Sequence, residues 1–570
     1  MAACKEAPSF TESMIARHNI CVALLGIDPW KEEAPNLRPF NYGMYRIAAA
    51  LRADGRVDDL HIVEGRHGEV EEIIERVEVV DPDIIGVSAY LWSLPTLFAA
   101  AERLKRSRPG RMIVIGGPSA RAEMMQQSPF AGAPQWVDAL VVTEAEQAMC
   151  GIVASAMNGT DLGSVGGLLL PDGNAWRSTA RPAECNLNHL ASPFQNGMAP
   201  RDVTGHLERF KGCQLNCTFC QWGEPSEARW VLSREFLIEE LRAYRESQAR
   251  GALIVDAGLN MGTEAFANLV AAEREVGFLR DTSLHCELYP RTLGDEHLDF
   301  LAGLDAHVGV GLQSFNPEAL ETVERPATVG NFEHIVGRIT EVAEASVEII
   351  LGLPGDTPQS FRTSFERARR LPCSTRVYQC LVLPDALMRR GGASLQMVFD
   401  PVTLEMRSCL GWSAEDLRRE QDRLSELLAA EGGGLHGHGW WHFEAPKGSR
   451  QSASARTASL PDGWCAEVAA LVRRVTRCDW ELRTATLEQG GLRLRCETTH
   501  GELTVDAWSA GTARPAYRVV GDVAIGYSMS TDRPIAAQEL RHFEALIPSV
   551  AQMAREELAR AQRVSSEEDR

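Results

Sequence analysis

The stretch Cys213-Gln-Leu-Asn-Cys217-Thr-Phe-Cys220 decides how the rest of the chain is interpreted. Its three thiols are separated by three and then by two residues, so they can converge on one side of a single loop. Iron–sulfur clusters prefer thiolate ligands, and three such sulfurs can bind three irons of a cubane 4Fe-4S cluster and leave the fourth iron open. The alternative is that these cysteines are small buried hydrophobic residues. We predict that Cys213, Cys217 and Cys220 are metal ligands.

The spacing of the cysteines, with the aromatic Phe219 just before the last one, resembles the signature of the radical S-adenosylmethionine (SAM) superfamily. The resemblance implies that the open iron chelates the amino and carboxyl groups of SAM, with the ring of Phe219 beside the adenine. Residues 207–212 look like the first barrel strand of that superfamily, with Glu208, Lys211 and Gly212 at the matching places.

Composition restricts the class of protein. A chain of 570 residues is too long for one hydrophobic core, so we expect about three or four domains. A net charge of -20 argues against a nucleic-acid partner, because proteins that follow phosphate backbones need concentrated Lys and Arg. Apolar runs stay below the roughly 18 residues that a membrane span needs, and residues 1–13 lack the features of a signal peptide. These features predict a cytoplasmic protein without a membrane partner.

Cysteine usage points to a reducing compartment. The chain has 14 cysteines, and outside the central triplet they are scattered singly. A disulfide framework is typical of small secreted domains, and this chain is neither small nor of secreted type. We therefore expect reduced thiols, which suits an oxygen-sensitive cluster.

Short apolar strands alternate with helical patterns over residues 1–160. Strands are expected at 20–27, 61–63, 83–88, 111–117 and 137–142, and helices at 42–51, 69–76 and 96–107. This alternation indicates an α/β fold with a doubly wound, Rossmann-like parallel sheet, whose ligands bind outside the carboxyl ends of the strands. Residues 161–200 are expected to be a linker that contains a short hairpin with its turn at 171–173.

Small and aromatic residues follow the predicted strands of this first domain. They resemble the strand-end segments of the cobalamin-binding domain that precedes many radical SAM methyltransferases. The residues concerned are Ser88, Tyr90, Trp92, Gly116, Gly117, Pro118 and Glu144. The resemblance implies that they bind cobalamin, since small residues let a large macrocycle approach the backbone. A flavodoxin-like domain without a cofactor is the alternative.

One feature of the related cobalamin domains is missing. The Asp-x-His-x-x-Gly segment, which supplies a histidine ligand to cobalt in methionine synthase-like domains, is absent from the sequence. The resemblance is therefore to the subclass whose cobalt has no protein histidine below it, which favours the nucleophilic cob(I) state. Arg66, with His67 as a second candidate, is expected to approach that lower face; otherwise both residues meet solvent.

Strand and helix patterns alternate again over residues 201–400. Strands are expected at 252–256, 283–288, 306–312, 347–351 and 375–383, and helices at 233–248, 262–275, 316–322 and 358–370. Together with the strand before the cysteines, they make six β/α units. We predict a partial (β/α)6 radical SAM barrel that is open on one side, which leaves a lateral mouth for a large substrate.

Chemistry in α/β barrels gathers at the carboxyl ends of the strands. The resemblance implies that Asp256, Asn260 and Gln313 help to hold SAM there, although Asp256-Ala-Gly-Leu-Asn260 replaces the usual Gly-Gly-Glu of the family. Glu287 and Tyr289 are expected to face the substrate, and they are our candidates for catalytic proton acceptors. The alternative for each of these residues is an ordinary strand end or a packed side chain.

The last third of the chain carries fewer motifs. A helix is expected at 413–430, and an aromatic segment with three histidines follows at 436–443. We interpret residues 401–462 as a helix and an aromatic loop that closes over the barrel mouth, with a metal site as the alternative. Residues 463–570 are predicted to form a small α+β domain that caps the substrate.

The resemblance covers roughly residues 20–400 and is to the cobalamin-dependent radical SAM C-methyltransferases, with the arrangement of tryptophan 2-C-methyltransferases of thiopeptide biosynthesis. It implies that a methyl group passes from SAM to cob(I)alamin and then to a carbon of a small-molecule substrate, which we expect to be C2 of tryptophan. It also implies an external electron donor. A radical route and a direct polar attack on the methyl group both stay open.

Other functions also fit the sequence. The substrate can instead be a peptide residue or another natural-product intermediate. A radical SAM cyclase or oxidase is a second enzyme class with the same upstream domain. A cobalamin or iron–sulfur regulator without SAM turnover is the alternative that is not an enzyme.

Overall fold

The computed structural model describes twelve segments of the chain. They are residues 20–27, 39–66, 68–180, 186–222, 230–326, 329–431, 434–436, 440–446, 480–488, 491–498, 501–508 and 516–521. His67 lies outside the described residues, as do residues 447–479 and 522–570. Among the described helices, none has the length and apolar character needed to cross a bilayer.

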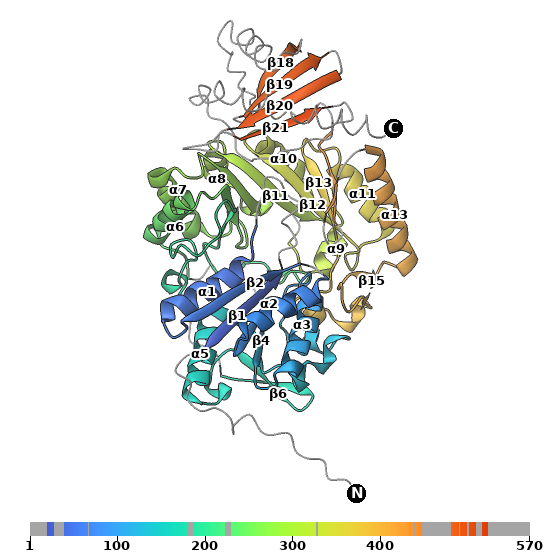
Figure 1. The fold of residues 1–570 in the computed structure, drawn as a ribbon. Helices are drawn as coiled ribbons and strands as arrows, with labels where there is room; N and C mark the ends of the chain where they lie inside the picture. The colour runs from blue at the N-terminus through green and yellow to red at the C-terminus, as the bar shows by residue number, and fades with distance from the viewer. Residues whose placement is uncertain are drawn as a thin grey trace, which may run out of the picture.

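The first sheet has the strand order β2-β1-β3-β4-β5-β6-β7, and its first five strands run parallel (Figure 1). These strands are β1 (Cys21–Ile27), β2 (Asp59–Gly65), β3 (Ile84–Ser88), β4 (Met112–Gly116) and β5 (Ala139–Val141). One face is covered by α1 (Tyr42–Asp54) and α5 (Ala145–Asn158), the other by α2 (Val70–Val80) and α3 (Leu94–Ser107). Both faces are buried, which explains the continuous apolar strands and confirms the predicted doubly wound sheet.

The hairpin expected in the linker instead extends this sheet. β6 (Leu168–Asp172) pairs antiparallel with β5, and β7 (Ala175–Ser178) pairs antiparallel with β6. Leu168 and Leu170 are buried in the same core as α1 and α5. Residues 168–178 therefore belong to the first sheet, because pairing with β5 buries leucines that a linker would expose.

The second sheet contains six parallel strands in sequence order, which confirms the predicted partial barrel. They are β8 (Gly205–Leu207), β9 (Gly251–Ile254), β10 (Ser283–Leu288), β11 (Asp305–Gln313), β12 (Glu344–Leu351) and β13 (Ser374–Gln379). The helices between them are α6 (Arg234–Glu246), α7 (Thr263–Val276), α8 (Asp295–Leu301), α9 (Pro317–Thr322), α10 (Phe332–Thr340), α11 (Pro358–Ala368) and, after β13, α12 (Leu387–Arg390). The sequence patterns do not single out α8 and α10.

The aromatic segment after the barrel is a strand, which corrects the predicted loop over the barrel mouth. It follows α13 (Ala414–Glu431), the expected helix. β17 (Trp440–Phe443) pairs antiparallel with β13, and β16 (Gly434–His436) pairs with β17. Trp441 and Phe443 are buried, whereas Trp440 and His442 are half-buried. This alternation is the pattern of a strand, and it attaches the segment to the edge of the barrel sheet.

The C-terminal region contains a four-stranded antiparallel sheet, drawn in red in Figure 1. Its strands are β18 (Trp480–Glu488), β19 (Gly491–Thr498), β20 (Gly501–Trp508) and β21 (Ala516–Gly521). They lie within the segment 463–570 for which a small α+β domain is predicted, and the capping role stays a prediction.

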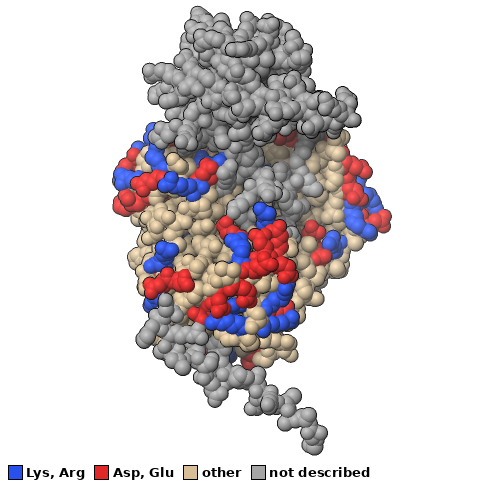
Figure 2. Space-filling model, in the orientation of Figure 1, with Lys and Arg blue, Asp and Glu red and all other residues tan. Residues whose placement is uncertain are grey.

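The charged side chains on the face drawn in Figure 2 occur in small mixed groups of both signs. Among the described residues on this face, no broad basic area is present. This distribution agrees with the net charge of -20.

Candidate active site

The three cysteines of the triplet lie in one partly buried group. Cys213 and Cys217 are buried, Cys220 is half-buried, and all three are free thiols. Burial raises the pKa of Cys220, and so do the neighbouring Cys217 and Cys213, which puts the sulfurs within electrostatic reach of one another. The Leu215 N–H donates to Cys213 Sγ at 3.4 Å, and Arg325 Nη1 donates to Cys217 Sγ at 3.6 Å. Grouped thiols with donors aimed at their sulfurs fit a 4Fe-4S cluster.

The cysteine loop is held by segments from distant strand ends. Arg390 Nη2 donates to the carbonyl oxygen of Cys217 at 3.0 Å and also to that of Cys220. The Thr218 N–H donates to the carbonyl oxygen of Val323 at 3.0 Å. Arg390, Arg325 and the backbone contact of Thr218 therefore fix this loop. No local pattern in the sequence indicates these three contacts.

The carboxyl ends of β3 and β4 form a closely packed backbone platform. Ser88 and Gly116 are partners in the register of the two strands, and the Ala89 N–H donates to the Gly116 carbonyl oxygen at 2.7 Å. Gly117 has a φ of +102°, and a Cβ there would lie 2.7 Å from the Ala89 carbonyl oxygen. Only glycine suits that position, which leaves a surface free of side chains where cobalamin is expected. The open backbone at the ends of these two strands fits cobalamin.

The predicted aromatic contacts lie beside this platform. The rings of Tyr90 and Trp92 stack with centroids 4.7 Å apart, and Trp92 Nε1 donates to the Ile27 carbonyl oxygen at 3.2 Å. Ser88 Oγ donates to Asn41 Oδ1 at 3.1 Å. These contacts fix three of the predicted side chains at the strand ends, and their contact with cobalamin stays a proposal.

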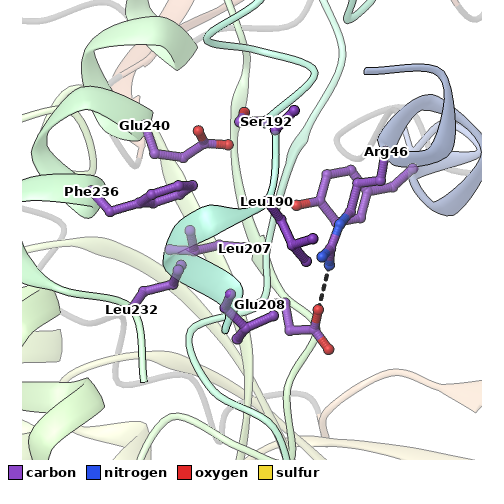
Figure 3. Close-up of a pocket in the computed structure, with 11 residues that line it drawn as sticks. Arg46, Leu190, Ser192, Leu207, Glu208, Leu232, Phe236 and Glu240 are labelled. Atoms are coloured by element: carbon purple, nitrogen blue, oxygen red, sulfur yellow. Dashed lines mark hydrogen bonds and ion pairs between the residues drawn. The ribbon is translucent and has the colours of Figure 1, made fainter. Parts of the chain in front are cut away.

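Glu144 is engaged in a charge network that the sequence does not predict. Its carboxylate lies 3.3 Å from Lys211 Nζ, which also pairs with Glu208 at 2.7 Å. Arg46 pairs with Glu208 (Figure 3). Arg46 also pairs with Glu146, at 2.7 Å. Burial alone would raise the pKa of Glu208, but the charges of Lys211 and Arg46 lower it. The Glu144 carboxylate thus binds the lysine that precedes the cysteines, and its contact with cobalamin stays a proposal.

The pocket in Figure 3 lies beside this network, between α1, α6 and the end of β8. It encloses about 330 Å³ of empty space. Burial raises the pKa of Glu240, on its wall, to about 7. None of the predicted site residues lines this pocket, so it is separate from the candidate active site.

The two domains meet next to the cysteine loop. Gln221 Nε2 donates to the carbonyl oxygens of Pro118, at 3.3 Å, and of Pro384, at 2.9 Å. Arg121 and Asp385 form an ion pair across the same boundary. The residue after the cysteine triplet thus contacts the loop after β4 and the loop after β13. This arrangement brings the predicted cobalamin edge to the carboxyl end of the barrel.

Arg66 follows β2 at the edge of the first sheet. Its side chain is 77 % exposed and lies 3.9 Å from Glu69. A position below cobalt therefore stays a prediction for Arg66, and His67 lies outside the described residues.

Two residues predicted to hold SAM have internal partners instead. Asp256 accepts hydrogen bonds from Arg209 Nε and Nη2, both at 2.8 Å, and both side chains are fully buried. The Asn260 side-chain amide donates to the Tyr289 carbonyl oxygen at 2.8 Å and accepts from the Tyr289 N–H at 3.0 Å. A buried carboxylate needs such a partner, so Asp256 and Asn260 brace strand ends, and their contacts with SAM stay a proposal.

Gln313 and Phe219 lie at positions that suit their predicted contacts with SAM. Gln313 has a φ of +74° and lies at an irregularity in the pairing of β11 with β12, at the carboxyl end of the strand. Phe219 packs against Ala319, Val323 and Leu353 beside the cysteine loop. Their contacts with SAM stay a proposal.

The inner face of the barrel sheet is polar around Glu287. Alternate residues of β10, such as Cys286 and Leu288, are buried on the opposite side in the core shared with the helices. The Glu287 side chain is accessible to solvent although protein surrounds it, as expected inside an open barrel. Burial and Glu348 raise its pKa well above the usual range, and Arg376 opposes this rise. A raised pKa favours the protonated form of Glu287, and its role as a proton acceptor stays a proposal.

Tyr289 lies between this interior and the cysteine loop. Its hydroxyl is buried and has no hydrogen-bond partner among the described residues. The Arg325 guanidinium lies 5.5 Å from the centre of its ring. Burial raises the pKa of the phenol, so Tyr289 keeps its proton and can donate it to a bound ligand. Its catalytic role stays a proposal.

One further group of metal-ligand side chains lies away from this site. The ligand atoms of Cys21, Asp59 and His61 lie within 4.8 Å of one another. They occupy the amino ends of β1 and β2, whereas the cofactor platform is at the carboxyl ends, so this group is not part of the candidate active site.

Both domains match known families. Residues 37–153 match the B12 binding domain, and residues 207–368 match the Radical SAM superfamily. The chain therefore contains one region that matches each of these two domain families. A radical SAM domain implies a 4Fe-4S cluster and SAM, and a B12 binding domain implies cobalamin. The cofactors that these domains imply are those that the cysteine triplet and the strand ends predict.

Curated relatives of the chain include methyltransferases. It is 26% identical over 338 residues to the 2-(S-pantetheinyl)-carbapenam-3-carboxylate methyltransferase of Streptantibioticus cattleyicolor, covering 54% of this chain and 48% of the relative. It is 24% identical, with the same coverage of both chains, to the cobalamin-dependent radical SAM methyltransferase TokK of Streptomyces tokunonensis. The chain spans about half the length of the curated relatives it matches.

A solved structure shares the fold of this chain. It is the methyltransferase TsrM of Kitasatospora setae with tryptophan and a SAM analogue bound. The TM-score is 0.53 at 17% identity, and the match covers 72% of this chain and 88% of that chain. The likeness extends across the B12 binding domain and the barrel together.

Proposed function

We propose that the chain is a cobalamin-dependent C-methyltransferase of natural-product biosynthesis. The observation that carries the proposal is the position of Gln221, which binds Pro118 of the B12 binding domain and Pro384 of the barrel from the residue after the cysteine triplet. When bound, the cofactors supply a methyl group that moves from SAM by way of cobalt to a substrate carbon. The similarity to methyltransferases over half of the chain supports the proposal.

The residues of the chain have separate tasks in this proposal. Gly117 leaves space for a large cofactor above the backbone, and the cysteines hold the cluster. Arg390 and Arg325 hold the cysteine loop, which keeps the cluster at a constant distance from the first domain. Tyr289 supplies a hydroxyl at the barrel end of the site.

Tryptophan is our proposed substrate, with its C2 carbon as the methyl acceptor. The shared fold with a structure that holds tryptophan supports this choice. The Trp440 and Tyr378 rings, stacked with centroids 5.7 Å apart on the inner side of the barrel sheet, suit an aromatic substrate.

An anaerobic assay tests the proposal. Protein with a reconstituted cluster is incubated with cobalamin, SAM, a reductant and tryptophan, and methyltryptophan, S-adenosylhomocysteine and 5'-deoxyadenosine are measured. Methyltryptophan without deoxyadenosine is the expected result and selects the polar route, while both products together select the radical route. Deoxyadenosine without a methylated product would instead indicate a cyclase or oxidase.

A cysteine variant controls this assay. C217A should lose the iron of the cluster and all SAM-dependent products, yet keep cobalamin, which binds to the other domain. C150A alters a half-buried cysteine on α5 and should keep both iron and activity. Unchanged iron content in C217A would contradict the proposed cluster site.

A further inference from the structure

Four side chains form one polar layer across the inner face of the barrel: Glu287 on β10, Glu348 on β12, and Arg376 and Tyr378 on β13. Glu287 pairs in register with Gly309 on β11, and Glu348 pairs with Arg376. A Cβ at Gly309 would collide with the Glu287 carboxyl group. The glycine therefore leaves the space that the carboxyl group occupies.

The two carboxyl groups of the polar layer have different partners. Glu348 accepts a hydrogen bond from Tyr378 Oη at 3.1 Å and lies 3.5 Å from Arg376 Nη1. Glu287 hydrogen-bonds to Glu348 and, among the described residues, forms no ion pair with a cation. Tyr378 and Arg376 thus hold Glu348 at short range, whereas Glu287 feels the charges of Arg376 and Arg325 without forming an ion pair with either of them.

Several polar atoms around this layer also lack partners. Arg376 Nε, Tyr289 Oη and His285 Nε2 are buried without a hydrogen-bond partner among the described residues. Native proteins rarely leave buried polar atoms unpaired, so such a group of atoms indicates a place for bound water or a ligand. Glu287 is open to solvent at the same place.

We propose that Glu287 binds a positively charged nitrogen of the substrate, while Arg376 and Tyr378 hold Glu348 beside it. The inference rests on the proposed function, since it names the class of substrate that the barrel accepts: a molecule with an ammonium group. The stacked Tyr378 and Trp440 rings then lie beside the layer as a wall for an aromatic part of the same molecule.

Binding of the cation is coupled to a proton. The groups that face Glu287 are Glu348, Arg376, Tyr378 and, from the segment after α9, Arg325. Burial and Glu348 raise the pKa of Glu287, which favours the protonated carboxyl group in the free site. An ammonium ion favours the carboxylate, and the proton leaves to solvent as the ion pair forms. Affinity for the amine should therefore rise with pH as long as the ligand stays protonated.

The test compares matched ligands on the anaerobic holoprotein. L-tryptophan and tryptamine carry the ammonium group, indole-3-propionate lacks it, and ethylammonium chloride carries it without an indole ring. Affinity is measured by equilibrium dialysis, proton release with an indicator dye, and the protonated carboxyl band by infrared spectroscopy. We expect about one proton released per amine bound, and at least about tenfold tighter binding of tryptamine than of indole-3-propionate.

Two variants make the test specific. E287Q keeps the size of the side chain and should abolish both the proton release and the preference for amines. E333Q removes an exposed carboxylate that pairs with Arg367 on the outer helices, and it should behave as the wild type. Iron content, cobalamin content and circular dichroism verify that E287Q is folded.

Two results would overturn the inference: a preference for amines that persists in E287Q, or the absence of proton release with every amine, ethylammonium included. S-adenosylhomocysteine is measured in the same samples. If it forms while no amine binds, the ammonium site is wrong and the proposed function stands. If it does not form while amines bind at Glu287, the proposed function fails and the site stands.

Discussion

Arg325 Nη1 lies 3.6 Å from Cys217 Sγ, although the two residues are 108 positions apart in the chain. A second nitrogen of the guanidinium, Nη2, donates to the Gly311 carbonyl oxygen at 2.5 Å, which fixes the side chain at the end of β11. The arginine therefore places a permanent positive charge beside one of the three cluster sulfurs. Hydrogen bonds and charge next to the sulfurs are among the factors that set the reduction potential of a cluster.

We predict that R325Q lowers the reduction potential of the 4Fe-4S cluster by about 30–60 mV, because a positive charge favours the reduced, more negative state. The measurement is a redox titration followed by electron paramagnetic resonance. R338Q, which removes an exposed arginine that pairs with Asp295, should leave the potential unchanged. Equal potentials in R325Q and the wild type would show that Arg325 only supports the loop.

G117A should weaken cobalamin binding by about tenfold or more and destabilise the first domain by about 1–3 kcal/mol. The alanine would adopt a φ of +102°, and its Cβ would lie 2.7 Å from the Ala89 carbonyl oxygen. Cobalamin is titrated by its absorbance, and unfolding is followed by circular dichroism. G132A is the matched control, since a Cβ there meets no atom within 4 Å. If G117A bound cobalamin with normal affinity, the backbone platform at Gly117 would not be part of the cobalamin site.

D256N should destabilise the barrel by about 3–5 kcal/mol, because it leaves the fully buried guanidinium of Arg209 without its counter-ion. Urea unfolding of the cofactor-free protein measures this change. D281N, which alters an exposed carboxylate paired with Arg245, should have little effect. If D256N instead kept its stability and lost only SAM affinity, the carboxylate would contact SAM as the sequence suggested.

The free energy of unfolding should fall as the pH rises through the pKa of Glu240. Burial raises the pKa of this carboxyl to about 7 in the folded protein, above the usual 4.5. The folded state therefore holds the proton more tightly, so the stabilisation is complete below about pH 4.5 and is lost as the pH rises through 7. Thermal unfolding of the wild type and E240Q between pH 5 and 8 measures the effect. We expect the wild type to lose up to about 3 kcal/mol relative to E240Q, and parallel curves would contradict the assignment.

Local patterns were enough to predict the two parallel sheets. The apolar run before Asp28 and the strand before the cysteines are buried strands in the structure, because the period of hydrophobic residues reports directly on burial. The same reasoning failed for the segment around Trp441. Three histidines and several glycines suggested a loop, but pairing with β13 made it a strand.

The candidate site was predicted less completely than the fold. The strand-end position of Asp256 was right, yet its carboxylate is used by Arg209, which precedes it by 47 residues. Glu144 likewise binds Lys211. A strand-end position indicates which residues can reach a ligand, but the neighbours that compete for the same side chain come from other strands.

The sequence by itself determined which residues can bind the cluster, because three cysteines on one short loop converge through local geometry alone. It also determined the order of strands and helices. Only the tertiary structure decided that Arg390 and Arg325 hold that loop, that Gln221 joins the two domains, and that Glu287 faces Glu348. These contacts join residues that are far apart in the chain, so the packing of the strands sets their distances and no spacing in the sequence records them.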